Sequence, residues 1–101
     1  MIARLWTGRT RADDYDKYLA YLEESGVAAL HATSGNRGVM VLRRLEGDEA
    51  EFGVMSFWDS IDDVKAFAGE DVDAAHYYPD DERFLLEFAP RVKHFEVARE
   101  L

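Results

Sequence analysis

Three histidines are the first candidates for chemistry, because histidine is the side chain that changes its protonation state near neutral pH. His76 precedes Tyr77 and Tyr78 in the run DVDAAHYYP, so a possible base stands beside two hydroxyl groups. His94 falls in the last predicted strand and can act as a general base if it reaches a substrate proton. The alternatives are a structural role for His94, satisfied by a polar neighbour, and a surface position for His31.

Aromatic residues make up 13% of the 101 residues, more than a core of this size requires. Those in predicted strands or beside His76 are Trp6, Phe52, Phe57, Trp58, Tyr77 and Tyr78. They predict either an apolar pocket for a small molecule or ordinary core packing, since aromatic side chains also dominate cores.

Acidic side chains outnumber basic ones by 21 to 12, which gives a formal net charge of −9. This balance argues against nucleic acid and against an anionic membrane, because both are first bound through basic patches. Six of the carboxylates lie between Glu70 and Glu82, but they lack the glycine and distal glutamate of a calcium loop. We therefore expect a solvated acidic face rather than a metal site, and a field that repels anionic substrates and admits neutral phenols.

The sequence contains no cysteine, which excludes disulfides, thiolate nucleophiles, zinc ribbons and iron–sulfur clusters. No phosphate-binding loop, dinucleotide fingerprint or nucleophile elbow is present. The first residues, MIARLW, do not resemble a secretion signal, and no apolar run approaches the ~18 residues of a membrane span. We expect a cytoplasmic protein.

The apolar pattern predicts an α+β fold of one domain, residues 1–101, that alternates strands with helical regions. The expected strands are residues 2–8, 39–45, 51–58 and 92–97, and the expected helical regions are 10–26, 27–30, 60–69, 71–78 and 79–90. This order is that of the split βαβ, or ferredoxin-like, fold, with an antiparallel sheet and helices on one of its faces.

Helix starts are predicted from capping residues. Thr10 with Asp13 and Ser60 with Asp63 have the spacing of capping boxes, in which the first side chain accepts from a backbone amide. Pro79, followed by three acids, is typical of a first helical turn.

Both faces of the predicted sheet are apolar. Successive strand residues point to opposite faces, so Val39 and Val41 share one face, and Met40 and Leu42 share the other. The strand 51–58 shows the same pattern, with Phe52, Val54 and Trp58 opposite Gly53, Met55 and Phe57. Because helices can cover only one face, we expect a second copy of the chain to cover the other in a homodimer.

The segments MIARLW, GNRGVMVLRR, EFGVMSFWDSIDDVKAFAGED and RVKHFEV together resemble the antibiotic biosynthesis monooxygenase family. This resemblance covers nearly the whole chain and implies a dimeric α+β barrel built from ferredoxin-like subunits. In the haem-degrading branch of the superfamily, a histidine after two alanines binds the haem iron, and AAH at 74–76 resembles that element. The pattern of that branch also includes an Asn near the end of the first strand and a Trp on the helix before the histidine. The matching positions of this chain are Thr7 and Phe67, so two of the three elements differ.

The resemblance implies three functions. The first is a cofactor-independent monooxygenase of small electron-rich aromatics, in which a dry pocket supplies a base and a donor for the developing oxyanion. His76, His94 and Tyr77 are then the expected catalytic residues, with no cofactor and no metal. The residues expected to contact the substrate are Trp6, Trp58, Phe67 and Tyr78. The second function is non-catalytic binding of a small hydrophobic molecule by the dimer, and the third is haem binding through His76.

Overall fold

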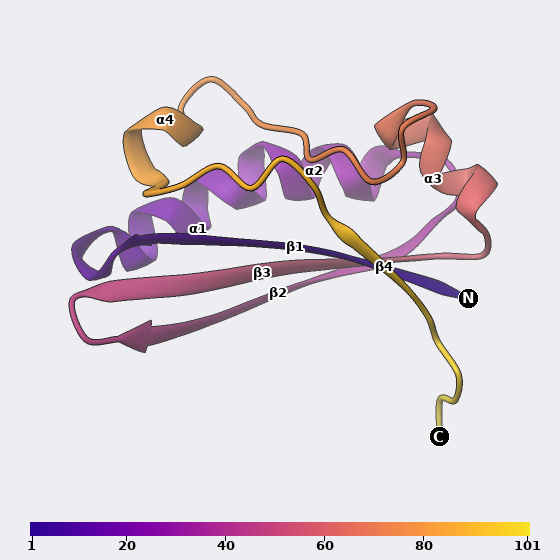
Figure 1. The fold of residues 1–101 in the computed structure, drawn as a ribbon, viewed down its shortest axis with the longest axis horizontal. Helices are drawn as coiled ribbons and strands as arrows, with labels where there is room; N and C mark the ends of the chain where they lie inside the picture. Colours follow the sequence, from indigo (N-terminus) through magenta and orange to yellow (C-terminus); the bar gives the residue numbers. More distant parts are fainter.

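An antiparallel sheet of four strands, in the order β2-β3-β1-β4, forms one layer of the computed structural model, which describes residues 1–101 (Figure 1). The strands are β1 (Ile2–Arg11), β2 (Asn36–Glu46), β3 (Glu49–Trp58) and β4 (Lys93–Glu96). β3 lies between β1 and β2, the arrangement that defines a split βαβ unit. The predicted α+β, ferredoxin-like fold is confirmed.

The helices form a second layer on one face of this sheet (Figure 1). They are α1 (Tyr15–Glu24), α2 (Gly26–Ala32), α3 (Ile61–Ala68) and the single turn α4 (Asp81–Phe84), with a short 3₁₀ helix, η1 (Ala12–Asp14), before α1. The segment between α3 and β4 runs over the same face (Figure 1). None of the helices reaches the length and apolarity that crossing a membrane requires.

The core lies between the two layers and is built from the inner residues of β1 and β3. Phe52 and Trp58 are completely buried, and the ring of Tyr18 from α1 meets Phe52 edge-on at a centroid distance of 5.0 Å. Val64 from α3 is also completely buried. The predicted inner face of β3 is thus the core face.

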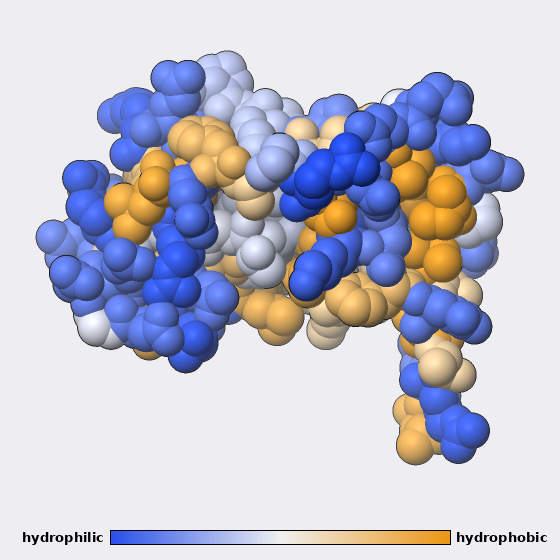
Figure 2. All heavy atoms as spheres, viewed as in Figure 1, coloured by the Kyte–Doolittle hydropathy of each residue, from blue (hydrophilic) through white to orange (hydrophobic).

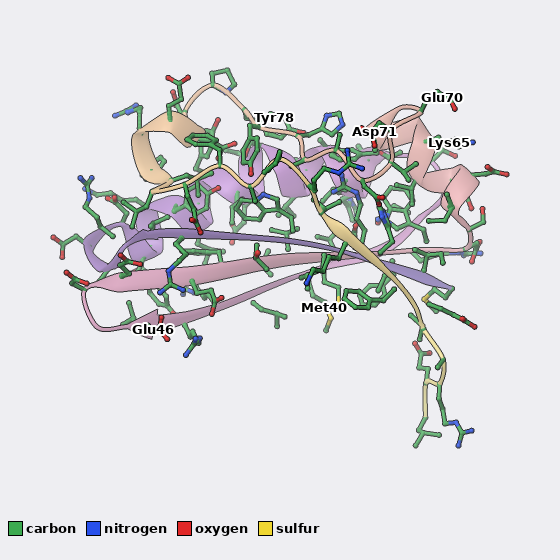
Figure 3. The ribbon with its side chains drawn as sticks, viewed as in Figure 1. Met40, Glu46, Lys65, Glu70, Asp71 and Tyr78 are labelled. Carbon is green, nitrogen blue, oxygen red and sulfur yellow. The ribbon has the colours of Figure 1, made fainter.

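The opposite face of the sheet is apolar and uncovered. Met40 is 56% exposed and Leu42 is 53% exposed, whereas Val39 and Val41 pack against the core. Figure 3 shows Met40 on the side of the sheet away from the helices, and Figure 2 shows apolar side chains along the lower margin, under the strands. We call this surface the outer face; its apolar residues are Ala3, Leu5, Met40, Leu42, Met55, Phe57 and Phe95.

Two of the three predicted helix starts are wrong. Thr10 does not cap a helix, because β1 stays paired with β3 as far as Arg11 and the Thr10 hydroxyl donates to the Arg11 carbonyl. Pro79 begins no long helix, because α4 ends at Phe84 and an extended chain follows it. Ser60 does cap α3, with its hydroxyl accepting from the Asp63 amide at 3.4 Å.

The region expected to form a helical turn over 71–78 contains one turn, closed by the hydrogen bond from the Ala74 amide to the Asp71 carbonyl, but no helix. Ala74 pairs with Arg91 in an isolated bridge, and the Val92 amide donates to the Asp73 carbonyl at 2.7 Å. This pairing draws residues 72–75 and 90–92 together above the sheet and sets the position of His76.

Candidate functional site

A small, partly open pocket lies between the inner face of the sheet and the helical layer. Its wall is mostly apolar, the composition usual for small-molecule sites. The lining residues are Arg4, Trp6, Tyr18, Leu22, Ser25, Gly26, Leu30, Val54, Phe67, His76, Tyr77, Tyr78 and Asp81. Five of the seven predicted site residues are therefore brought together: Trp6, Phe67, His76, Tyr77 and Tyr78.

Trp6 and Tyr77 form a fixed aromatic wall. The Trp6 indole Nε1 donates to the Tyr77 hydroxyl at 3.2 Å, and the two rings lie edge to face. The Tyr77 hydroxyl in turn donates to the Ala89 carbonyl. Because its only proton is used in that bond, Tyr77 orients Trp6 and has no proton left for a developing oxyanion.

Gly8 makes room for the Trp6 indole. A Cβ atom at Gly8 would stand 2.5 Å from Trp6 Cη2, closer than real Cβ atoms approach other atoms. The position of the indole in the pocket therefore depends on a glycine two residues along the same strand.

His76 lies at the mouth of the pocket, with its side chain exposed. Its Nε2 is 3.2 Å from the Ala68 carbonyl, and its ring lies 5.1 Å from the ring of Phe67. A carbonyl only accepts hydrogen bonds, so Nε2 donates and the neutral ring keeps its lone pair on Nδ1. Nδ1 is therefore the atom of His76 that can accept a substrate proton.

Tyr18, Tyr78 and Asp81 form a buried polar group at the helical wall. Asp81 Oδ1 accepts from the Tyr18 hydroxyl at 2.9 Å, and Oδ2 accepts from the Tyr78 amide at 2.7 Å. Burial, together with the Asp81 carboxylate, raises the pKa of Tyr18 far above its ordinary value and also raises the pKa of Tyr78. Both phenols therefore stay protonated at neutral pH.

Arg4 is the charged residue of the pocket that the sequence reading did not select. It lies on β1, one inner-face position from Trp6, and is only 4% exposed. Burial lowers the pKa of its guanidinium, and the nearby carboxylate of Asp73 partly offsets this. The signal for Arg4 in the sequence is a cation at an inner position of an otherwise apolar strand face.

His94, an expected catalytic residue, does not line the pocket. It pairs with Arg4 across β4 and β1 and therefore points to the helical side. Its Nδ1 lies 2.7 Å from Asp73 Oδ1, and its Nε2 is buried without a partner. The observed contact is the structural alternative, a histidine held by a polar neighbour.

Trp58 also lies outside the pocket. It is completely buried in the core, and its Nε1 donates to the Ser56 hydroxyl at 2.9 Å. Trp58 therefore does not line this pocket, because the inner face of β3 at this end is buried in the core.

The acidic stretch that follows α3 is tied to basic residues elsewhere in the chain. Arg91 Nη1 lies 2.9 Å from Asp71, and Lys65 lies 3.8 Å from Glu70 (Figure 3). No three metal-binding side chains converge anywhere in the structure. Five of the six carboxylates thus belong to a solvated, partly ion-paired surface. The sixth, Asp81, is buried, contrary to the expectation.

No protein-family model and no curated protein matches the chain. Among solved structures, it is similar to a point mutant of MhuD, a structure described as holding two manganese protoporphyrin IX molecules per active site. The TM-score is 0.62 and the identity 19%, and the match covers 100% of this chain and 98% of that one. The two proteins share an α+β fold of the kind that the resemblance to antibiotic biosynthesis monooxygenases implied.

Thr7 stands where the haem-degrading branch has an Asn, and this difference weakens the resemblance to that branch. The side chain of Thr7 is exposed and borders a hollow on the outer face, with Leu5 and Leu42. It therefore points away from His76, and the inner position beside it is occupied by Trp6. Phe67 does line the pocket, against His76.

Proposed function

We propose that the chain binds a small, electron-rich aromatic molecule in this pocket and oxidises it with dioxygen without a cofactor. The observation that supports this function is an aromatic, mostly apolar pocket with a histidine at its mouth whose Nδ1 is free to accept a proton. Residues Trp6, Phe67 and Tyr78 supply the flat apolar surfaces that stack on an aromatic ring.

The reaction follows from the atoms that the pocket supplies. His76 Nδ1 accepts a proton from a phenol or from an acidic ring CH₂ group, and the resulting carbanion or phenolate gives its electrons to dioxygen. A ring CH₂ group, or the para C–H carbon of a phenol, becomes C=O, and the second oxygen atom leaves as water together with the proton held by His76. Both oxygen atoms are thus accounted for, and the substrate supplies all the electrons. Exclusion of water by the aromatic wall protects the anion from reprotonation.

The test measures binding and oxygen uptake separately. Calorimetric titration of the purified protein with 1-naphthol and anthrone is expected to show binding, and an oxygen electrode is expected to show uptake with anthrone. His76→Ala should lower the rate at least about 100-fold, the usual contribution of a general base. His31→Ala is the matched control, because His31 is an exposed histidine on α2 that does not line the pocket.

Each outcome separates the candidates. Binding without oxygen uptake would favour a non-catalytic ligand-binding protein, and absence of binding would contradict the proposal. A rate unchanged in His76→Ala would remove His76 from the reaction.

Haem binding through His76 is the second candidate, favoured by the AAH element and by the porphyrins in the similar MhuD structure. One feature fits: metal-bound histidines usually donate their other ring N–H to a carbonyl, as His76 does to Ala68. Haem bound there would supply an iron that activates dioxygen. Haem titration tests it, because a Soret shift lost in His76→Ala would favour haem over a cofactor-free reaction.

We also propose that the working unit is a homodimer formed through the outer face. Half-exposed apolar side chains, Met40, Leu42 and Phe95 among them, gather there on neighbouring strands. Soluble monomers seldom expose an apolar patch beyond a few hundred Å². A second copy covers this face most simply, as the resemblance to dimeric α+β barrels implies.

A further inference from the structure

The guanidinium of Arg4 is buried in the pocket wall without a counter-charge in contact. Arg4 is 4% exposed, and none of its nitrogen atoms forms an ion pair with a carboxylate. Its Nη2 donates to the Ala74 carbonyl at 2.9 Å, and its Nε is buried with no hydrogen-bond partner. Buried charges are normally paired, so this arrangement calls for a partner that comes from outside the chain.

The neighbouring carboxylates are already engaged with other groups. Asp73 Oδ1 contacts His94 Nδ1 at 2.7 Å, and its Oδ2 lies 3.7 Å from Arg91. Asp81, which shares the pocket with Arg4, accepts one hydrogen bond at each of its oxygens. Neither carboxylate is in contact with Arg4.

Phe67 holds the guanidinium in place. The Arg4 Cζ lies 5.2 Å from the centre of the Phe67 ring, within the range of a cation–π contact. The same phenylalanine packs against His76 on the mouth side of the pocket. Arg4 is therefore fixed in the wall of a pocket whose other lining groups are mostly aromatic or apolar.

We infer that Arg4 binds an anionic oxygen of the pocket's ligand, and that the natural ligand is an aromatic carboxylate. This inference rests on the proposed function, since it assumes that the pocket holds an aromatic molecule. A planar guanidinium matches a carboxylate better than any other side chain does. The inference departs from the expectation that the pocket repels anions. The net charge of −9 is spread over the surface, and the one carboxylate in the pocket wall, Asp81, already accepts hydrogen bonds from Tyr18 and Tyr78, whereas the Arg4 guanidinium has an unused donor.

The experiment compares two ligands of the same shape, 1-naphthoate and the neutral 1-naphthalenemethanol, by calorimetry at pH 7. In the wild type we expect the dissociation constant of 1-naphthoate to be at least about tenfold lower, as a charge-assisted hydrogen bond predicts. In Arg4→Met we expect the preference to vanish, because methionine keeps the unbranched apolar stem without the charge. In Arg4→Lys we expect part of it to remain.

Arg43→Met is the matched control. Arg43 also stacks on an aromatic ring, that of Tyr15 at 3.9 Å, but it pairs with Asp16 and lies outside this pocket. We expect this variant to keep the wild-type preference for 1-naphthoate.

The outcomes distinguish the two proposals. Equal affinity of the wild type for both ligands, or a preference that Arg4→Met retains, would overturn the anion site and leave the aromatic pocket intact. Failure of both ligands to bind the wild type would overturn the proposed function, and the anion site with it. If Arg4→Met fails to fold, the wild-type ratio and the Arg4→Lys ratio still decide the question.

Discussion

At the scale of residues, the position of Trp6 depends on the absence of a side chain at Gly8. We predict that Gly8→Ala displaces the indole, breaks its bond to Tyr77 and lowers the stability by about 1–3 kcal/mol, the usual cost of overpacking. It should also weaken binding of aromatic ligands. Thermal denaturation and calorimetric titration measure the two effects.

Gly26→Ala is the control for the loss of stability alone, because its Cβ would meet Tyr78 at 3.5 Å, an ordinary contact, while Gly26 itself lines the pocket. Equal behaviour of the two variants would show that the indole does not depend on the space at Gly8.

The burial of Tyr18 beside the Asp81 carboxylate, which accepts its hydrogen bond, predicts a loss of stability in alkali. The folded state raises the pKa of Tyr18 above its ordinary value of 10.0, so below pH 10 both states keep the proton. Above pH 10 the unfolded chain loses it first, which favours unfolding by up to about 1.4 kcal/mol per pH unit for this group.

The measurement is the free energy of unfolding in urea between pH 8 and pH 11.5. The advantage of the wild type over Tyr18→Phe should be constant below pH 10 and should shrink above it. A constant difference across the whole range would mean that Tyr18 does not contribute to the alkaline transition.

The residue types that gather in the pocket could be predicted, but not their roles. His76, Tyr77 and Tyr78 adjoin in the sequence and also line the pocket. The Tyr77 hydroxyl donates to the Ala89 carbonyl, a bond between two segments that lie 12 residues apart in the chain. No local sequence pattern predicts such a bond. Arg4 was missed because its burial is set by the segment that crosses over β1.

At the scale of elements, the sequence correctly predicts that Ser60 caps the start of α3. We predict that Ser60→Ala lowers the free energy of unfolding by about 0.5–1 kcal/mol, because the Asp63 amide at the start of α3 loses its acceptor. Urea denaturation measures the change. Ser34→Ala, an exposed serine with no side-chain hydrogen bond, should have no effect, and an equal loss in both variants would contradict the capping role.

Long-range pairing explains where the element predictions failed. The Thr10 signal for a cap is present in the sequence, but the pairing of Thr10 with Ala50 extends the strand through it. The stretch 71–78 forms no helix, because backbone bonds from Ala75 to Pro90 and from Val92 to Asp73 tie it to the segment before β4. The helix propensity of a short segment does not predict hydrogen bonds to residues far away in the sequence.

At the scale of the whole molecule, the outer face predicts self-association. Light scattering at micromolar concentration should return twice the chain mass of 11.6 kDa. Leu42→Lys should give a folded monomer, because the symmetric interface would bury two unpaired ammonium groups. Leu86→Lys is the matched control, since Leu86 is 49% exposed but lies in the segment between α4 and β4, on the helical side of the sheet (Figure 1). A wild-type monomer would contradict the prediction.

Salt should strengthen this dimer. Each copy carries a net charge of −9, so two copies repel one another at long range while their apolar faces attract at contact. Raising the ionic strength from about 0.01 M to about 0.15 M shortens the screening length from about 30 Å to about 8 Å, which weakens the repulsion and leaves the apolar contact in place. The dissociation constant measured by analytical ultracentrifugation should therefore fall as sodium chloride is added. A dissociation constant that rises with salt would indicate an interface held by ion pairs, and would place it on a surface other than the apolar face of the sheet.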